Sequence, residues 1–122
     1  MKTVLVVDDS RIMRNIVKNT FLDLKIPCQF LEAENGQKAL EILVANKVNI
    51  VFLDWNMPEM DGIEFLRIVR VMPEYKDIPI IMVTSESAKY SIVEAAQSGI
   101  TDYIVKPVSQ KVFMDKISDI SF

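Results

Sequence analysis

The sequence predicts an α/β fold of the flavodoxin-like type, a doubly wound (βα)5 protein whose five-stranded parallel sheet has the order 2-1-3-4-5. Short apolar runs alternate with segments of helical period along the whole chain. Such strict alternation predicts a parallel sheet with helices on both faces. Five strand–helix units favour this open sheet over a closed barrel, which needs eight.

Five apolar runs are the expected strands. Residues 4–7 and 50–53 are apolar throughout, which is typical of strands that are buried on both faces of a parallel sheet. Residues 30–31 belong to a more polar strand, which we expect at an edge of the sheet. The last two strands cover residues 78–83 and 103–105.

Apolar residues spaced three and four apart mark five helices between and after these strands. The first helix should bury a face that includes Met13, Ile16 and Leu24. A fourth helix should span residues 87–98, with Gly99 at its C-terminal cap. The second, third and fifth helices correspond to the apolar patterns within residues 39–43, 63–69 and 112–120.

Composition indicates one soluble globular domain over residues 1–122. Hydrophobic residues make up 50% and charged residues 25%, and the net charge of -3 argues against nucleic acid or an anionic membrane as a partner. The single cysteine, Cys28, cannot form an internal disulfide, no apolar stretch could cross a bilayer, and no signal peptide is recognisable. We therefore expect a cytoplasmic monomer without membrane insertion.

Polar residues follow the strands at the edge of the sheet where ligands bind in this fold. Asp8 and Asp9 follow the first strand, and Asp54 follows the third. These strands should be neighbours at the topological switch point, so that the three carboxylates share one crevice. Thr84 and Lys106 end the next two strands. Clustered carboxylates repel one another, and a divalent cation, a lysine or a raised pKa could offset the repulsion.

The chemistry of this set fits a hard metal ion and a phosphoryl group. The sequence has no histidine for a softer metal site, and Mg²⁺ fits better than Ca²⁺ because it needs few protein oxygens and keeps several waters. Asp54 is the best candidate nucleophile, since a carboxylate can form an acyl phosphate. Magnesium, Lys106 and the Thr84 hydroxyl would then contact the phosphoryl oxygens.

Each of these residues alone has an ordinary structural explanation. An acid before a helix, such as Asp9, is usually a cap or a solvated charge, and a single strand-end threonine or lysine is common. The functional interpretation depends on the coincidence of all five residues at one edge. Alternation along the strand also turns Trp55 away from Asp54, toward the mouth of the crevice rather than the core.

Five short motifs occur in a fixed order along the chain. They are Val-Val-Asp-Asp-Ser-Arg at 6–11, Asp-Trp-Asn-Met-Pro at 54–58, Asp-Gly at 61–62, Met-Val-Thr-Ser-Glu at 82–86 and Tyr-Ile-Val-Lys-Pro at 103–107. In this order and spacing, the chain resembles the receiver domain of two-component response regulators over its whole length. The resemblance implies a phosphorylated signalling protein, not an enzyme beyond promoting its own phosphorylation and dephosphorylation.

The resemblance also implies a role for each matching residue. Asp54 would accept the phosphoryl group from a histidine kinase. Asp8 and Asp9 would hold Mg²⁺, and Asp54 and the backbone carbonyl of Asn56 would complete the protein ligands.

Further residues would convert phosphorylation into a change of the protein surface. Thr84 and Lys106 would contact the phosphoryl group and drive the switch, and Tyr103 would report it through a change of rotamer. The peptide between Lys106 and Pro107 is cis in the family. The surface for a downstream protein target would include Tyr103, Glu86, Lys89, Ile92 and Lys116.

Two positions match the chemotaxis type within the family. These are Asn56, two residues after the phosphorylated acid, and Glu86, two residues after the switch threonine. They favour control of chemotaxis, with the flagellar motor switch as the expected kind of target. Val108, where an aromatic residue commonly follows Lys-Pro, and Ser85, where alanine is frequent, depart from the pattern near the output surface.

Other roles share parts of this chemistry. A phosphorelay carrier, or a receiver domain excised from a larger response regulator, would use the same site. A Mg²⁺-dependent aspartyl phosphatase of the haloacid dehalogenase type is less favoured, because it needs a second aspartate where this chain has Asn56. A flavodoxin is disfavoured because Asp8 and Asp9 would repel a bare phosphate after the first strand.

Overall fold

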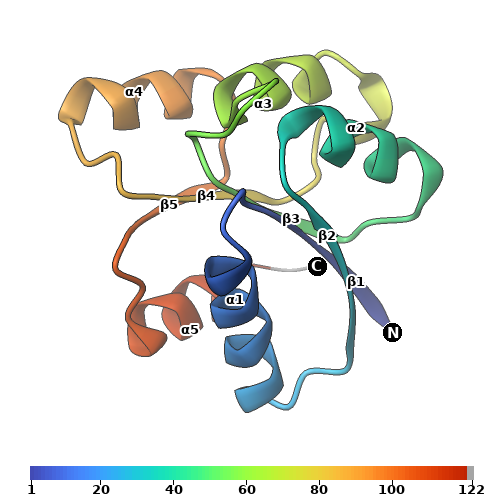
Figure 1. Ribbon diagram of the computed structural model, residues 1–122, viewed down its shortest axis with the longest axis vertical. Coiled ribbons are helices and arrows are strands. Elements are labelled where there is room, and N and C mark those ends of the chain that lie inside the picture. Colours follow the sequence, from blue (N-terminus) through green and yellow to red (C-terminus); the bar gives the residue numbers. More distant parts are fainter. Residues whose placement is uncertain (121–122) are drawn as a thin grey trace.

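The computed structural model describes residues 1–120 and confirms the doubly wound sheet. Five parallel strands lie in the order β2-β1-β3-β4-β5 (Figure 1). The strands are β1 Lys2–Val7, β2 Cys28–Ala33, β3 Ile50–Leu53, β4 Ile80–Thr84 and β5 Asp102–Val105. The helices are α1 Arg11–Asp23, α2 Gly36–Ala45, α3 Gly62–Arg70, α4 Lys89–Gln97 and α5 Gln110–Ser118, with a short 3-10 helix at Pro73–Tyr75.

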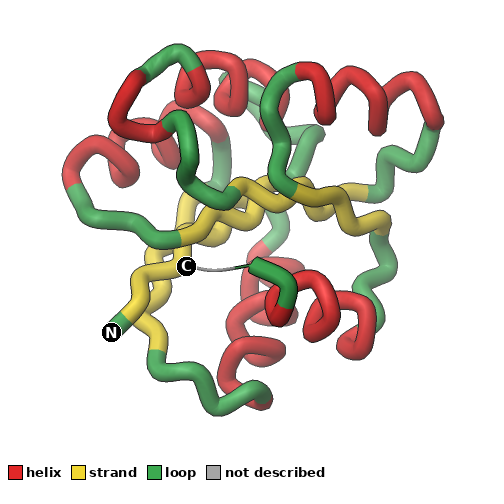
Figure 2. Tube along the Cα trace, turned by 180° about the vertical axis from the view of Figure 1, so that it is seen from behind, coloured by secondary structure: helices red, strands yellow, loops and turns green. Residues whose placement is uncertain are grey.

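Helices cover both faces of the sheet. The helices α1 and α5 lie on one face, and α2, α3 and α4 lie on the other (Figures 1 and 2). The strands β3 and β4 are buried along their whole length, and β1 is buried from Val4 onward. This arrangement explains the uninterrupted apolar runs, since a strand covered on both faces needs apolar side chains in both directions. Within residues 1–120, every helix is too short or too polar to span a membrane.

The sheet divides the core into two apolar clusters. On the α1/α5 face, the ring of Phe21 lies edge-on to Phe52 and Phe113, with centroid distances of 5.4 and 5.9 Å, and Phe52 stacks on Phe113 at 5.0 Å. On the other face, Phe65 and Leu66 of α3 belong to a cluster that also includes residues of α2 and α4. Each of these side chains is almost fully buried, and such burial contributes about 1.5–3 kcal/mol per side chain.

The edge strand and the first helix differ in detail from the sequence prediction. The strand β2 lies at the edge, as predicted, but it is longer than expected because it pairs with β1 from Lys2 opposite Cys28 to Val7 opposite Ala33. In α1, the apolar pattern is wider than the buried face, and Ile16 is 38% exposed. The buried residues of α1 are Val17, Thr20 and Phe21.

Side-chain caps determine where four of the five helices begin. In each of these four, the N-cap side chain accepts a hydrogen bond from the backbone N–H three residues later. The capping residues are Ser10, Asn35, Asp61 and Ser109. The helix α4 follows Ala88, which has no capping oxygen, and it begins at Lys89 rather than at Ser87 as predicted. Its end agrees with the prediction, since Gly99 has a φ of 100° directly after the helix cap.

The loop after β3 folds back onto its own beginning. The Gly62 N–H donates a hydrogen bond to the Trp55 carbonyl at 2.8 Å. A Cβ atom on Gly62 would lie 2.1 Å from the backbone oxygen of Asp54, which is far inside van der Waals contact. The start of α3 is therefore locked against the end of β3, and only glycine fits at this position.

Gly62→Ala should lower the free energy of unfolding by about 1–3 kcal/mol, because the new methyl group must displace the backbone of Asp54. Urea unfolding followed by circular dichroism would measure the change. Gly99→Ala is the comparison, and it should cost less, about 1 kcal/mol for the positive φ, because its Cβ would meet only the flexible Arg70 side chain. A Gly62→Ala protein as stable as the wild type would contradict the close approach.

Candidate functional site

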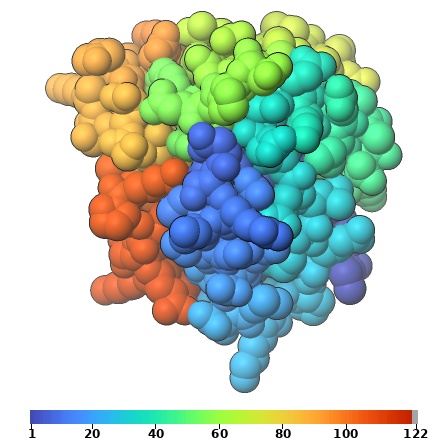
Figure 3. Space-filling model, in the orientation of Figure 1, coloured from blue at the N-terminus to red at the C-terminus, as the bar shows by residue number. Residues whose placement is uncertain are grey.

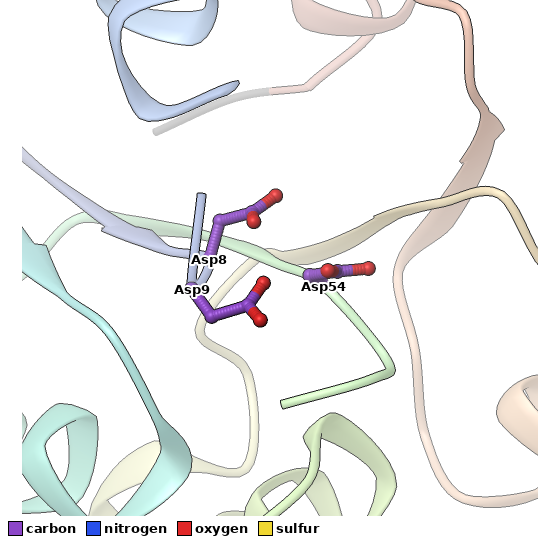
Figure 4. Close-up of side chains that lie close together, drawn as sticks. All are labelled: Asp8, Asp9 and Asp54. Atoms are coloured by element: carbon purple, nitrogen blue, oxygen red, sulfur yellow. The ribbon is translucent and has the colours of Figure 1, made fainter. Parts of the chain in front are cut away.

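Three aspartates from two neighbouring strands meet at one edge of the sheet. Asp8 and Asp9 follow β1, and Asp54 follows β3, whose end is held to β1 by a hydrogen bond of 2.9 Å from the Asp54 N–H to the Val7 carbonyl. One carboxylate oxygen of each aspartate lies within 4.8 Å of the others, and Figure 4 shows the three side chains grouped together. The predicted convergence of these acids is confirmed.

Burial makes the negative charge of Asp8 costly. Asp8 and Asp54 are only 5% and 6% exposed, whereas Asp9 is exposed. Burial raises the pKa of Asp8, and the charge of Asp54 adds to this, while hydrogen bonds from the Ser10 N–H and from Lys106 lower it. Because the folded pKa lies above the unfolded one, the stability linked to Asp8 is present at low pH and is lost as the pH rises through the folded pKa.

Lys106 places a positive charge between two of the acids. Its Nζ lies 3.0 Å from Asp8 Oδ2 and 3.5 Å from Asp54 Oδ2, and its side chain is 18% exposed. Lys106 directly follows β5, and its backbone N–H donates at 2.8 Å to the carbonyl of Thr84, the last residue of β4. Its peptide bond to Pro107 is cis, as the resemblance implied. One ammonium group offsets only part of the charge of three carboxylates.

Thr84 and Tyr103 hold the main chain of Glu86 from two sides. Thr84 is fully buried, and its hydroxyl oxygen accepts a hydrogen bond from the Glu86 N–H at 3.3 Å. The Tyr103 hydroxyl donates to the Glu86 carbonyl at 2.6 Å. Burial, followed by the charges of Glu86 and Asp54, raises the pKa of Tyr103 to about 12, so the phenol remains a hydrogen-bond donor at neutral pH. The loop after β4 is therefore tied both to β4 and to β5.

The two residues after Asp54 lie in different surroundings. Asn56 is exposed in the loop between β3 and α3. Trp55 is half-buried, and its backbone N–H donates to Asp54 Oδ1 at 2.8 Å. The predicted partial exposure of Trp55 is confirmed, but its predicted orientation away from the core is wrong. Its side chain packs against the apolar cluster below α3, as do Met57 and Met60, because a large ring gains more by covering apolar surface than by facing water.

The residues expected on the output surface lie in unlike environments. Lys89 is exposed and Ile92 is 37% exposed, both on α4. Lys116 on α5 instead pairs with Asp102, with 2.9 Å between Nζ and Oδ1, and both side chains are half-buried. The helix α4 therefore presents exposed side chains, whereas the charge of Lys116 is already compensated.

Arg14 and Glu32 approach the site, and the sequence prediction included neither. Arg14 Nη1 donates a hydrogen bond of 2.6 Å to the backbone oxygen of Asp8, and Arg14 Nε lies 3.0 Å from Glu32 Oε1. The cap at Ser10 puts Arg14 in the first turn of α1, close to Asp8, and this is the one weak indication of the contact in the sequence. Glu32 lies far away in the sequence, and only the register of β2 brings it near.

The three carboxylates fit a hard divalent cation. All three offer oxygen ligands, two of them from residues that directly follow buried strands, and such ligands suit Mg²⁺ or Ca²⁺ rather than a soft metal. Among residues 1–120, these acids form the one group of histidine, cysteine or acidic side chains close enough together to share an ion. A cation there would offset the charge that Lys106 leaves uncompensated.

Known proteins are similar to this chain in sequence and in fold. The sequence profile of the response regulator receiver domain matches residues 4–118. The chemotaxis protein CheY homolog of Campylobacter jejuni is 45% identical over 117 residues, which cover 95% of this chain and 89% of that protein. The chemotaxis protein CheY1 of Helicobacter pylori is also 45% identical, with coverage of 93% and 91%. The structure of the Vibrio cholerae chemotaxis protein CheY4 superposes with a TM-score of 0.89 at 31% identity, covering 99% of both chains.

Sequence, fold and site lead to the same assignment. An acidic triad like that of Asp8, Asp9 and Asp54 is typical of the metal site of receiver domains. The relatives named here are chemotaxis signalling proteins rather than enzymes. The chain belongs to the response regulator receiver domain family.

Proposed function

We propose that this chain is a phosphorylation-controlled switch that accepts a phosphoryl group from a histidine kinase onto Asp54. The observation that carries the proposal is the convergence of Asp8, Asp9 and Asp54, with Lys106 between two of them. A carboxylate flanked by a cation site and an ammonium group suits attack on phosphorus, because phosphoryl transfer depends mainly on positioning and on neutralising the oxygens. The P–N bond of phosphohistidine would break as a P–O bond to Asp54 forms.

Magnesium is the ion that we propose for the site. Asp8 and Asp9 would hold it, together with Asp54 and the backbone carbonyl of Asn56. When bound, the ion would neutralise phosphoryl oxygens. Supporting this choice, all the side-chain ligands are carboxylates, and Mg²⁺ accepts a small number of protein oxygens and keeps several waters.

Each remaining site residue has a proposed part in the switch. Lys106 would pair with a phosphoryl oxygen, and the Thr84 hydroxyl would turn from the Glu86 N–H toward another. Because Thr84 and Tyr103 both bond to the main chain of Glu86, such a movement would reach Tyr103 through a single residue. The two arrangements of Thr84 and Tyr103 would both be populated in the unphosphorylated protein, and the phosphoryl group would shift their populations.

A downstream protein is the proposed reader of this change. The reading surface would include Tyr103, Glu86, Lys89, Ile92 and Lys116. The chemotaxis relatives support a role in chemotaxis, with the flagellar motor switch as the proposed kind of target. We further propose that residues 1–122 act as a single cytoplasmic receiver unit, monomeric before activation.

Acetyl phosphate with Mg²⁺ should add one phosphoryl group to the wild type and none to Asp54→Asn. Intact-mass spectrometry would measure the labelling. Asp61→Asn is the matched control, because Asp61 caps α3 and asparagine is an equally good cap, so this variant should label like the wild type. Equal labelling of wild type and Asp54→Asn would refute the assignment of Asp54.

Asp9→Asn should weaken Mg²⁺ binding and raise the melting temperature of the metal-free protein. Removing one of three crowded charges should relieve about 1 kcal/mol of repulsion, which corresponds to about 3–5 °C in a domain of this size. Differential scanning calorimetry with a chelator and with Mg²⁺ would test both effects. Asp115→Asn, on an exposed position of α5, should change neither. A lower melting temperature for Asp9→Asn would instead indicate a structural role for this carboxylate.

Trp55 should report ligand binding through its fluorescence, since it directly follows Asp54 and its backbone N–H donates a hydrogen bond to the Asp54 carboxylate. Magnesium should change the emission, and beryllofluoride, a phosphoryl mimic, should change it further only when Mg²⁺ is present, because three carboxylates repel the mimic without the cation. The order of addition provides the control. A full beryllofluoride response in chelator-treated protein would exclude the metal from the mechanism.

A further inference from the structure

We infer that Arg14 is a positioning residue for the metal ligands, because its side chain fixes the main chain that carries Asp8 and Asp9. The inference rests on the proposed function, in which these two aspartates hold the cation. It assigns to the guanidinium group a task that is separate from ligation and from phosphoryl transfer. It also explains why a positive side chain lies so close to a site intended for a cation.

The Asp8 main chain lies at the point where strand pairing ends. Its N–H donates to the Ala33 carbonyl at 3.0 Å, in continuation of the β1–β2 ladder. The strand β2 ends at Ala33 and offers no further N–H in the ladder to the Asp8 carbonyl. Arg14 Nη1 takes that place, with a donor–acceptor distance of 2.6 Å. The guanidinium group therefore supplies the hydrogen-bond donor that a longer β2 would have supplied to the Asp8 carbonyl.

The guanidinium group of Arg14 is itself held in place. Its Nε bonds to Glu32 Oε1 at 3.0 Å, and the second oxygen of Glu32 accepts from Lys18 Nζ at 3.0 Å. The Arg14 side chain is only 15% exposed. Figure 3 shows the blue segment of α1 against the cyan segment that contains β2 and α2. Planar guanidinium groups suit such two-sided contacts, because their donors point in fixed directions.

Asp9 depends on this support more than Asp8 does. The Asp8 carboxylate has contacts of its own, to the Ser10 N–H and to Lys106. In the described part of the chain, the Asp9 carboxylate is exposed and accepts no hydrogen bond. Its position relative to Asp8 is therefore determined by the backbone between them, and Arg14 holds the carbonyl that begins this peptide.

The direction in which an Arg14 substitution changes cation affinity distinguishes a positioning role from a purely electrostatic one. If Arg14 acted only through its charge, removing that charge would strengthen the binding of a nearby divalent cation. If Arg14 positions the ligands, its removal weakens binding although a repulsive charge has gone. Residues that orient metal ligands typically contribute about 10–100-fold to metal affinity.

The test is a Mg²⁺ titration of Arg14→Gln and Arg14→Lys at constant ionic strength, followed by Trp55 fluorescence. Both variants should bind Mg²⁺ about 10-fold more weakly. Glutamine lacks both the charge and the planar guanidinium group that bonds to Asp8 and Glu32 at once, and lysine keeps the charge but lacks that group. Lys18→Gln is the matched control, since it removes a contact to Glu32 without touching Asp8. This control should stay within about 2-fold of the wild type, well short of the 10-fold effect.

A second measurement needs no metal. Backbone ¹⁵N relaxation of the Asp9 and Ser10 amides in chelator-treated protein should show greater mobility in both Arg14 variants, and not in Lys18→Gln. Tighter Mg²⁺ binding by Arg14→Gln with unchanged binding by Arg14→Lys would overturn the inference in favour of electrostatics. A lower melting temperature with unchanged affinity and unchanged relaxation would overturn it in favour of a structural role. If the wild type binds no Mg²⁺, the proposed metal is wrong, and the relaxation data still decide whether Arg14 fixes the turn.

Discussion

Repulsion among the carboxylates of Asp8, Asp9 and Asp54 determines how the surrounding residues are used. Asp8 and Asp54 cannot move apart, because β1 and β3 pair from Val4 opposite Ile50 to Val7 opposite Leu53 and these paired residues are buried on both faces. A close-packed interior transmits strain rather than absorbing it. The charge must therefore be compensated where it lies. This requirement accounts for the lysine between two of the acids and for the main-chain donors directed at them.

The route from this site to the surface is short and runs through the main chain. Glu86 lies two residues after Thr84, and both of its peptide groups are held, one by a threonine hydroxyl and the other by a tyrosine hydroxyl. In the proposed switch, displacing one of these bonds would change the environment of the other without a chain of intermediate side chains. The coupling would thus depend on one loop with two anchors, a simpler arrangement than a network across the core.

Most of the fold could be predicted because it depends on patterns that are local in the sequence. Uninterrupted apolar runs identified the buried strands, and the aspartates after two of these runs located the site. The errors arose where tertiary contacts decide the outcome. The wider apolar pattern of α1 did not show that Ile16 faces solvent, and nothing local indicated that Trp55 covers the core.

The contacts that support the site could not be predicted from the sequence, because they too depend on tertiary structure. The pairing of Arg14 with Glu32 requires the register of β2 against β1, which a single sequence does not contain. The closeness of Gly62 to the Asp54 carbonyl requires the path of the intervening loop. The ligands of a site can thus be recognised by residue type, whereas the residues that hold those ligands are identified by geometry.

The division of the core by the sheet has a consequence for how this protein can diversify. Among residues 1–120, the buried side chains on the α1/α5 face and those on the α2/α3/α4 face form two separate clusters, and substitutions in separate clusters tend to have independent effects. Each layer can therefore accumulate changes without repacking the other. In the proposed switch, one chemical event at the edge that carries the aspartates would then be presented to two surfaces that evolve separately.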